Sequence, residues 1–160
     1  FARPQEPHLQ DCDLDEILDK NIQFLQMALE TKKILLRDNL SHQPLPLRAD
    51  PQLLYRSFLN IFMNAIQAME NAGTLSVSVS VEKDQYRVVI EDGGGGIREK
   101  DLKKIFDPSF STKDKGSGLG LSIVRNIIEG HRGRIWIESH HKESTARKTG
   151  TQVFIQLPKG

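Results

Sequence analysis

The sequence has very little cysteine and no long apolar run. Its single cysteine, Cys12, excludes a disulfide within the chain and fits a reducing compartment. No apolar run approaches the length of about 20 residues that a membrane-spanning helix needs, and no signal peptide opens the chain. Because the chain begins with Phe1 instead of methionine, we expect it to be a piece of a longer protein.

An excess of charge of either sign is also lacking. The 22 basic and 21 acidic residues leave a net charge of +1, which gives no electrostatic reason to expect a nucleic-acid partner. With 160 residues, 38% of them hydrophobic, the chain is long enough for one domain with a substantial core. We therefore expect a single globular domain.

Glycine is concentrated in two clusters in the second half of the chain. The first cluster, residues 93–96, follows the apolar run of residues 86–90, where a strand is expected to end. The second cluster, G-S-G-L-G-L over residues 116–121, opens a helical pattern. Helix N-termini present unpaired N–H groups, and glycine lets an anion such as phosphate reach them. The two clusters therefore predict a nucleotide site.

The common nucleotide-binding motifs do not fit these glycines. A P-loop has a lysine directly after its last glycine, whereas Gly120 is followed by Leu121. A dinucleotide fingerprint has G-x-G-x-x-G after a strand, whereas residues 116–120 run G-x-G-x-G after a polar segment. The eukaryotic protein kinase motifs are absent as well. The glycines alone therefore do not decide the class of nucleotide-binding protein.

A further element, N-I-F-M-N over residues 60–64, lies upstream of the glycines. With it, the sequence resembles the ATP-binding catalytic domain of sensor histidine kinases, in the GHKL ATPase superfamily, possible subfamilies including the nitrogen-regulation type. In that family an asparagine box precedes a D-x-G-x-G box, an F box and a G-x-G-L-G-L box. This chain has all four in order: Asn60 and Asn64, then Asp92, Gly94 and Gly96, then residues 106–113, then residues 116–121.

The resemblance implies roles for individual residues. Asn64 is expected to coordinate the Mg²⁺ that bridges the phosphates of ATP, and Asn60 to help position that ion, which makes both candidate catalytic residues. Asp92 is expected to accept a hydrogen bond from the amino group of adenine, which guanine lacks. The other expected contacts with ATP are Gly94, Gly96, Ile97, Lys113, Gly116, Gly118, Leu119, Gly120 and Leu121.

The resemblance also implies a fold, an α/β two-layer sandwich of the Bergerat type, with a mixed, mainly antiparallel sheet and helices on one face. Residues 1–10 are expected to be a linker from a missing phosphoacceptor helical domain, and residues 11–160 the ATP-binding catalytic domain. Hydrophobic periodicity and capping residues predict helices after Asp13, from Asp50 to a stop at Gly73, and over residues 98–105 and 119–129. They predict strands over residues 33–40, 45–48, 74–81, 86–90, 134–139 and 151–157.

As a function, the resemblance implies transfer of the γ-phosphate of ATP to a histidine on a phosphoacceptor domain of the same parent protein. A response regulator receiver domain is the second expected partner, and the parent is expected to be a homodimer. We expect this domain to be cytoplasmic without membrane contact, whether the parent is soluble or membrane-anchored. None of the five histidines has the H-E/D-x-R-x-P context of a phosphoacceptor, so the chain alone is not expected to autophosphorylate. His131, at the end of a predicted helix, is expected to be structural because a cation is favourable there.

Three other functions stay open from the sequence. In the related gyrase, chaperone and mismatch-repair ATPases, a glutamate at the position of Asn60 is the general base, and an amide cannot take that proton, which disfavours a hydrolase. A serine kinase of the anti-sigma-factor or mitochondrial dehydrogenase-kinase type would use the same nucleotide pocket. A non-catalytic nucleotide sensor would bind ATP without labelling any acceptor.

Overall fold

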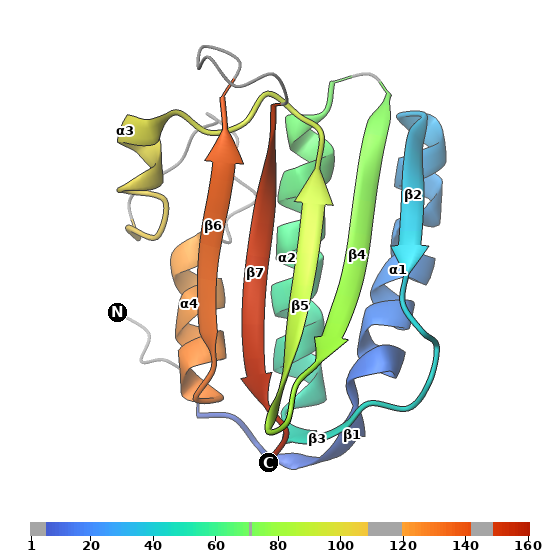
Figure 1. Cartoon of the computed structure of the whole chain (residues 1–160), viewed down its shortest axis with the longest axis vertical. Coiled ribbons are helices and arrows are strands. Elements are labelled where there is room, and N and C mark those ends of the chain that lie inside the picture. The colour runs from blue at the N-terminus through green and yellow to red at the C-terminus, as the bar shows by residue number, and fades with distance from the viewer. Residues whose placement is uncertain (1–5, 71, 109–119, 142–148) are drawn as a thin grey trace.

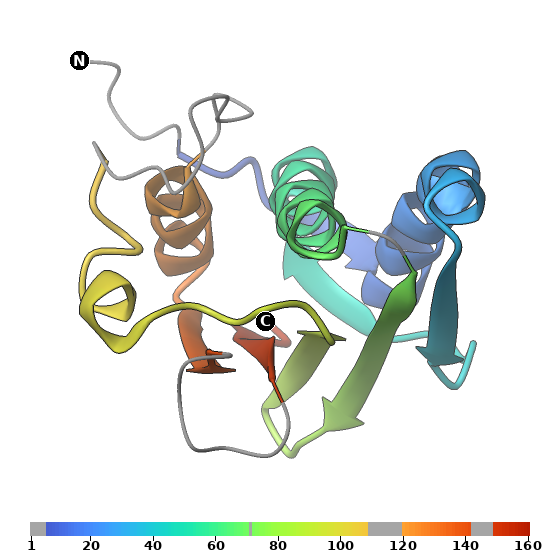
Figure 2. The ribbon, with the colours of Figure 1, turned by 90° about the horizontal axis from the view of Figure 1, so that it is seen from above.

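The body of the domain is a five-stranded sheet with the long helices on one face (Figures 1 and 2). The computed structural model describes residues 6–70, 72–108, 120–141 and 149–160. The strands, in spatial order, are β2 (Ile34–Asn39), β4 (Gly73–Val81), β5 (Gln85–Asp92), β7 (Gly150–Pro158) and β6 (Arg134–His140). The helices on the covered face are α1 (Leu14–Thr31), α2 (Pro51–Ala68) and α4 (Leu121–Gly130). The predicted two-layer α/β sandwich is confirmed.

The sheet is mixed, as predicted. β2 runs parallel to β4, and the other neighbouring pairs are antiparallel. Because parallel neighbours need a long crossover, the chain leaves the sheet after β2 and returns through α2. On that path β3 (Pro46–Ala49) pairs with β1 (Gln10–Asp13) in a separate two-stranded sheet. The strand predicted over residues 45–48 therefore exists, but it belongs to this small sheet.

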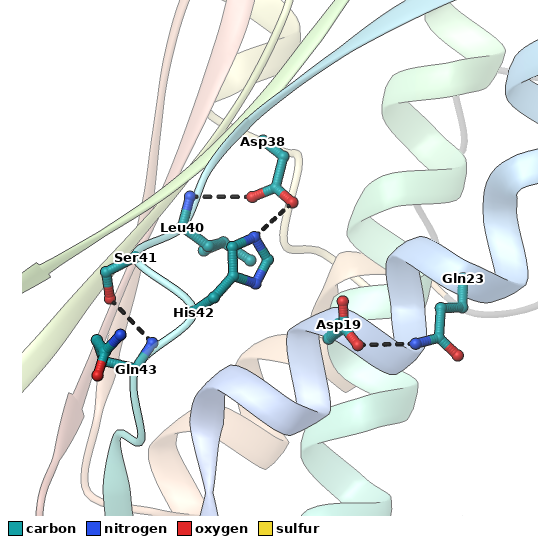
Figure 3. A network of polar contacts seen from close by, with 7 residues as sticks. All are labelled: Asp19, Gln23, Asp38, Leu40, Ser41, His42 and Gln43. Carbon is teal, nitrogen blue, oxygen red and sulfur yellow. Dashed lines mark hydrogen bonds and ion pairs between the residues drawn. The ribbon is translucent and has the colours of Figure 1, made fainter.

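The turn between β2 and β3 is held by side-chain contacts of its own (Figure 3). Oδ1 of Asp38 accepts the backbone N–H of Leu40 at 3.0 Å, and Oδ2 lies 2.9 Å from Nε2 of His42. Oγ of Ser41 accepts the backbone N–H of Gln43 at 3.4 Å. His42 has φ 58°, a left-handed conformation that few residues adopt without local support. These contacts carry the chain from the sheet edge to the small sheet.

The hydrophobic core lies between the helices and the covered face of the sheet. α1 begins after Asp13, as predicted, and the side chain of Asp13 accepts the backbone N–H of Asp15 at 2.9 Å. The two largest fully buried side chains of the core, Phe58 and Phe62, come from α2, one turn apart. None of the helices in the described part of the chain has the length and hydropathy that a membrane crossing requires.

α2 begins where the sequence predicts and ends earlier. Oδ1 of Asp50 accepts the backbone N–H of Leu53 at 3.1 Å, which caps the helix. The helix ends at Ala68, so the prediction that Gly73 stops it was wrong. Met69 follows with an extended backbone and is 2% exposed. A Cβ on Gly73 would lie 2.6 Å from the sulfur of Met69, so Gly73 leaves room for this buried side chain at the start of β4.

Two of the other predicted helices also differ in extent. The helix predicted over residues 98–105 is the short α3 (Glu99–Leu102), followed by turns. The helix predicted over residues 119–129 is α4, which begins at Leu121. The predicted contact residues Lys113, Gly116, Gly118 and Leu119 lie outside the described residues.

Asp50 and His131 join the start of α2, the end of α4 and the incoming chain. The backbone N–H of Asp50 donates to Nε2 of His131 at 3.0 Å, and Nδ1 of His131 lies 2.8 Å from the carbonyl oxygen of Ile127. Because Nε2 accepts a hydrogen bond, Nδ1 carries the proton and the ring is uncharged. Oδ2 of Asp50 accepts the backbone N–H of His8 at 3.0 Å. His131 thus has a structural place, but as a neutral bridge and not as the expected cation.

The substitution His131→Phe is expected to lower the free energy of unfolding by about 2–4 kcal/mol. His131 is 7% exposed, and a phenyl ring has nearly the same volume as its imidazole. The substitution therefore mainly removes the hydrogen-bond partner of the N–H of Asp50 and of the carbonyl of Ile127. Urea unfolding at neutral pH measures the change. The matched control is His8→Phe at an exposed position, expected to stay within about 0.5 kcal/mol of the original chain. Equal effects of the two substitutions would contradict the structural role of His131.

Candidate nucleotide-binding site

Two asparagines lie one turn apart on α2. Asn60 is 5% exposed and Asn64 is half-buried, although asparagine is a poor residue for a helix interior. The amide of Asn64 makes no hydrogen bond to another residue in the part of the chain that the structure describes. A half-buried amide oxygen without a protein partner suits a hard cation such as Mg²⁺. The residues present therefore fit the magnesium ion that the sequence implies.

Asp92 is the last residue of β5 and is 6% exposed. The alternation along the strand turns it toward the covered face, together with Val88 and Ile90. Its Oδ1 accepts the backbone N–H of Gly94 at 2.8 Å. Burial raises the pKa of the Asp92 carboxyl from 3.8 to about 6; the bond from Gly94 opposes this rise and the charge of Glu91 adds to it. A buried acceptor thus stands at the end of the central part of the sheet.

The raised pKa of Asp92 predicts that this residue destabilises the chain as the pH rises. The folded state binds the proton up to about pH 6 and the unfolded chain only up to about 3.8, so the contribution is most favourable below pH 3.8 and is lost through pH 6. At 1.36 kcal/mol per pH unit, the loss approaches about 3 kcal/mol at neutral pH. Asp92→Asn should therefore be more stable than the original chain, by a margin that grows by about 1.4 kcal/mol between pH 5 and pH 7.5. Urea unfolding at both pH values measures this margin, and a margin independent of pH would contradict the prediction.

Gly94 brings the segment after β5 against the end of α2. A Cβ on Gly94 would lie 2.7 Å from the carbonyl oxygen of Ala68 and 3.0 Å from Oδ1 of Asp92. Ala68 is four residues beyond Asn64, which is about 6 Å along the helix axis. The asparagine box and the D-x-G-x-G box are therefore neighbours in space, and the glycine allows the close approach.

Gly96 and Ile97 are held by the ends of β6 and β7. Gly96 has φ 76°, and a Cβ there would overlap the carbonyl oxygen of His140. The backbone N–H of Ile97 donates to Oγ of Ser139 at 2.7 Å, and this hydroxyl lies 2.8 Å from Oγ1 of Thr151. The segment is thus fixed on one side by α2 and on the other by two strand ends.

Ser139 and Thr151 are positioning residues that the sequence did not reveal. Thr151 is 8% exposed and is the cross-strand partner of Asp92. Ser139 reaches Ile97 over 42 residues of sequence, a separation that no local pattern indicates. The one available signal was the polar pair of residues 151–152 near the start of an otherwise alternating strand.

α4 brings Leu121, the last residue of the G-x-G-L-G-L box, toward the asparagines. α4 packs beside α2, and its end at His131 contacts Asp50 at the start of α2, so the two helices run in opposite directions. Ten residues separate Asp50 from Asn60, and ten separate His131 from Leu121. At 1.5 Å per residue, Leu121 and Asn60 therefore both lie about 15 Å from the contact between the helices.

The N-terminus of α4 fits the predicted phosphate side of the site. Gly120 is its N-cap residue, with no side-chain cap on the free N–H groups. The first residue of the F box, Phe106, lies against the same helix, its ring centroid 5.3 Å from the guanidinium carbon of Arg125. Of the predicted contacts in the described residues, Asn60, Asn64, Asp92, Gly94, Gly96, Ile97, Gly120 and Leu121 thus lie on adjoining elements.

Comparison with known protein families and sequences agrees with this site. The model of the family described as "Histidine kinase-, DNA gyrase B-, and HSP90-like ATPase" matches residues 49–160. Sporulation kinase A of Bacillus subtilis is 31% identical over 149 residues, which cover 92% of this chain and 25% of that protein. The sensor histidine kinase ZraS of Escherichia coli K12 is 35% identical over 139 residues, 87% of this chain and 30% of that protein. The chain thus spans a quarter to a third of the length of these relatives.

Solved structures of histidine kinases have the same fold. The catalytic domain of the histidine kinase ThkA is similar with a TM-score of 0.83 and 28% identity, over 95% of this chain and 96% of that one. The structure of ThkA in complex with the response regulator protein TrrA is similar with a TM-score of 0.81 and 26% identity, over 96% of this chain and 42% of that one. This chain therefore belongs to the histidine kinase-, DNA gyrase B- and HSP90-like ATPase family and is an ATP-binding catalytic domain of the histidine kinase type.

Proposed function

We propose that this chain binds ATP with Mg²⁺ and donates the γ-phosphate to a histidine on a separate phosphoacceptor domain of the same parent protein. The proposal rests mainly on the close approach of Gly94 to the end of α2. This approach brings the D-x-G-x-G box, which begins at Asp92, to within one helical turn of Asn64. Phosphoryl transfer depends mainly on positioning and on charge stabilisation, and these boxes supply both on the donor side. The relatives named as kinases support the same activity.

Three polar side chains of the site have proposed tasks. The amide oxygen of Asn64 would be a ligand of Mg²⁺, and Asn60, one turn away, would help to position that ion. Bound Mg²⁺ would neutralise charge on the phosphate oxygens. Oδ1 of Asp92 already accepts the backbone N–H of Gly94. Its other oxygen would accept a hydrogen bond from the amino group of adenine. Lys113, Gly116, Gly118 and Leu119 stay predicted contacts on the phosphate side.

The wider assignment is also a proposal. Residues 1–10 would be the linker from the phosphoacceptor domain, in a homodimeric parent whose second partner is the receiver domain of a response regulator. The similar structure of ThkA, a histidine kinase bound to a response regulator protein, supports a partner of this kind. A cytoplasmic position of this domain would be consistent with the single free thiol of Cys12.

A hydrolase is the less favoured alternative. The position expected to hold a general base carries the amide of Asn60, which is 5% exposed and cannot take a proton from water at neutral pH. The chain should therefore hold ATP without rapid turnover until a protein side chain accepts the phosphoryl group.

Labelling with ATP that carries a radioactive γ-phosphate tests the proposal. The chain and Mg²⁺ are incubated alone and with the purified phosphoacceptor domain of the parent, and acid-labile phosphohistidine is measured. Label is expected on the acceptor domain only, with at least a 100-fold lower rate for Asn64→Ala. The matched control is Gln52→Ala, an exposed amide on the same helix. Label on the isolated chain, or rapid release of free phosphate, would contradict the proposal.

A further inference from the structure

The face of the sheet opposite to the helices carries an aromatic cluster that the nucleotide site does not use. Trp136 and Phe154 are cross-strand partners on β6 and β7, and their rings are stacked with centroids 5.1 Å apart and an interplanar angle of 3°. Ile135 and Ile137 pack against the core, so Trp136 between them points to the opposite face. With Val89, the partner of Phe154 on β5, these side chains form what we call the central row. No element in the described ranges covers this face (Figure 2).

On β5 and β6, charged residues of opposite sign flank the central row. Arg134 and Arg87 lie two residues to one side of it, on β6 and β5, and form the arginine row. Glu138 and Glu91 lie two residues to the other side, on the same strands, and form the glutamate row. The guanidinium carbon of each arginine is 5.6 Å from the ring centroid of Trp136. Arg37 on β2 lies level with the glutamate row, and Arg87 pairs with Glu82 at 3.7 Å. On β5 and β6, the two strands that carry both rows, the two signs lie on opposite sides of an apolar strip.

This pattern is complementary to itself. A two-fold axis can be placed along the central row, between the faces of two copies. Rotation about this axis brings the second face against the first and moves each charged row to the other side of the central row. The arginine row of each copy then meets the glutamate row of the other, with Arg134 opposite Glu138 of the second copy. The central rows meet each other, which removes Trp136 and Phe154 from water. Such an isologous contact is the commonest kind in protein oligomers.

We propose that two copies of this chain associate through these sheet faces about such a two-fold axis. A strongly acidic or basic partner would fit less well, because it would meet one row with like charge. Five strands about 4.8 Å apart, with about seven residues of about 3.4 Å each, give a face of roughly 550 Å², or about 1,100 Å² for both copies. This area is near the lower limit of about 1,000 Å² for a specific interface. The dimer is thus weak, with a dissociation constant on the order of 10–100 μM.

The association leaves the nucleotide site free. The asparagines of α2 and the carboxyl of Asp92 lie on the covered face of the sheet, away from the central row. A dimer through the open face therefore places the two nucleotide sites on its outer sides. The proposal does not depend on the proposed kinase activity and is tested without nucleotide.

Trp136, the chain's single tryptophan, reports the association directly. Sedimentation of the chain from about 1 μM to about 1 mM is expected to show a monomer that converts to a dimer with the stated dissociation constant. Over the same range the emission of Trp136 should shift to shorter wavelength and its quenching by acrylamide should fall. A monomer at every concentration would overturn the proposal, as would protection of Trp136 only by an added receiver domain or lipid vesicle.

Charge exchange on β6 separates this contact from a general loss of folding. Arg134→Glu is expected to weaken the dimer at least about 10-fold, because like charges then meet across the axis. The double substitution R134E/E138R exchanges the two charges on β6, so position 134 again meets the opposite charge at position 138 of the second copy, and the dissociation constant should return to within about 3-fold of the original. The control is Lys20→Glu on α1, the same change of charge on the covered face, which should leave the dimer unchanged. Equal affinities of the single and double variants would overturn the two-fold arrangement.

Discussion

Replacing Asp92 with asparagine is expected to weaken the binding of a non-hydrolysable ATP analogue by about 100-fold. The backbone N–H of Gly94 needs an acceptor and takes one oxygen of the carboxylate. In Asp92→Asn the amide oxygen would fill that need, which leaves the amide NH₂ facing the amino group of adenine. Two donors then meet in a buried place, and both stay unpaired. Calorimetric titration in the presence of Mg²⁺ measures the loss.

The matched control for Asp92→Asn is Glu91→Gln. Glu91 is the neighbouring carboxylate on the same strand, and its bond from Gln152, at 3.1 Å, lies on the opposite face of the sheet. Its substitution should change the affinity by less than about 2-fold. A GTP analogue should bind Asp92→Asn at least as well as the original chain, because guanine carries a carbonyl oxygen where adenine carries the amino group. Full ATP affinity in Asp92→Asn would remove Asp92 from the site.

Replacing Gly96 with alanine is expected to lower the free energy of unfolding by about 3 kcal/mol or more. Its φ of 76° costs an alanine about 1–2 kcal/mol, and the added Cβ would overlap the backbone carbonyl of His140, which cannot move away without disturbing β6. Urea unfolding measures the change. Hydrogen exchange of the Ile97 amide, bonded to Ser139 at 2.7 Å, shows whether the segment detaches locally.

Gly95→Ala is the control for Gly96→Ala. A Cβ on Gly95 would meet no atom within 4 Å, and its φ lies outside the left-handed range. This variant should keep both its stability, to within about 0.5 kcal/mol, and the protection of the Ile97 amide. If the two alanine variants behave alike, the close contact of Gly96 with β6 does not fix this segment.

Local signals were sufficient for the beginnings of α1 and α2. Asp13 and Asp50 each place a side-chain acceptor before an apolar periodic stretch, and both cap helices in the structure. The end of α2 was mispredicted because a buried contact decides it. The local sequence indicates that Gly73 stops the helix. In the structure, the absence of a Cβ at Gly73 leaves room for the side chain of Met69, whose burial depends on the whole core.

The site was predictable where a motif carries it and not where distant segments meet. Asn64 and Asp92 belong to short patterns with fixed spacing, and the structure places both on adjoining elements. Ser139 supports the site only because β6 ends beside residue 97, a fact of sheet topology. The pairing of β1 with β3 was missed for the same reason, since Gln10 and Ala49 become partners only after the chain has folded.

The two carboxylate oxygens of Asp50 accept different backbone hydrogen bonds, and this affects how the domain responds to a pulling force on the chain before it. Oδ2 holds the backbone of His8, whereas Oδ1 holds the N–H of Leu53 and so caps α2. A pull on the chain before His8 loads the first bond alone. That bond can break while the cap of α2 and the contact with His131 stay intact. The incoming chain can therefore be detached under tension without unwinding the helix that carries Asn60 and Asn64.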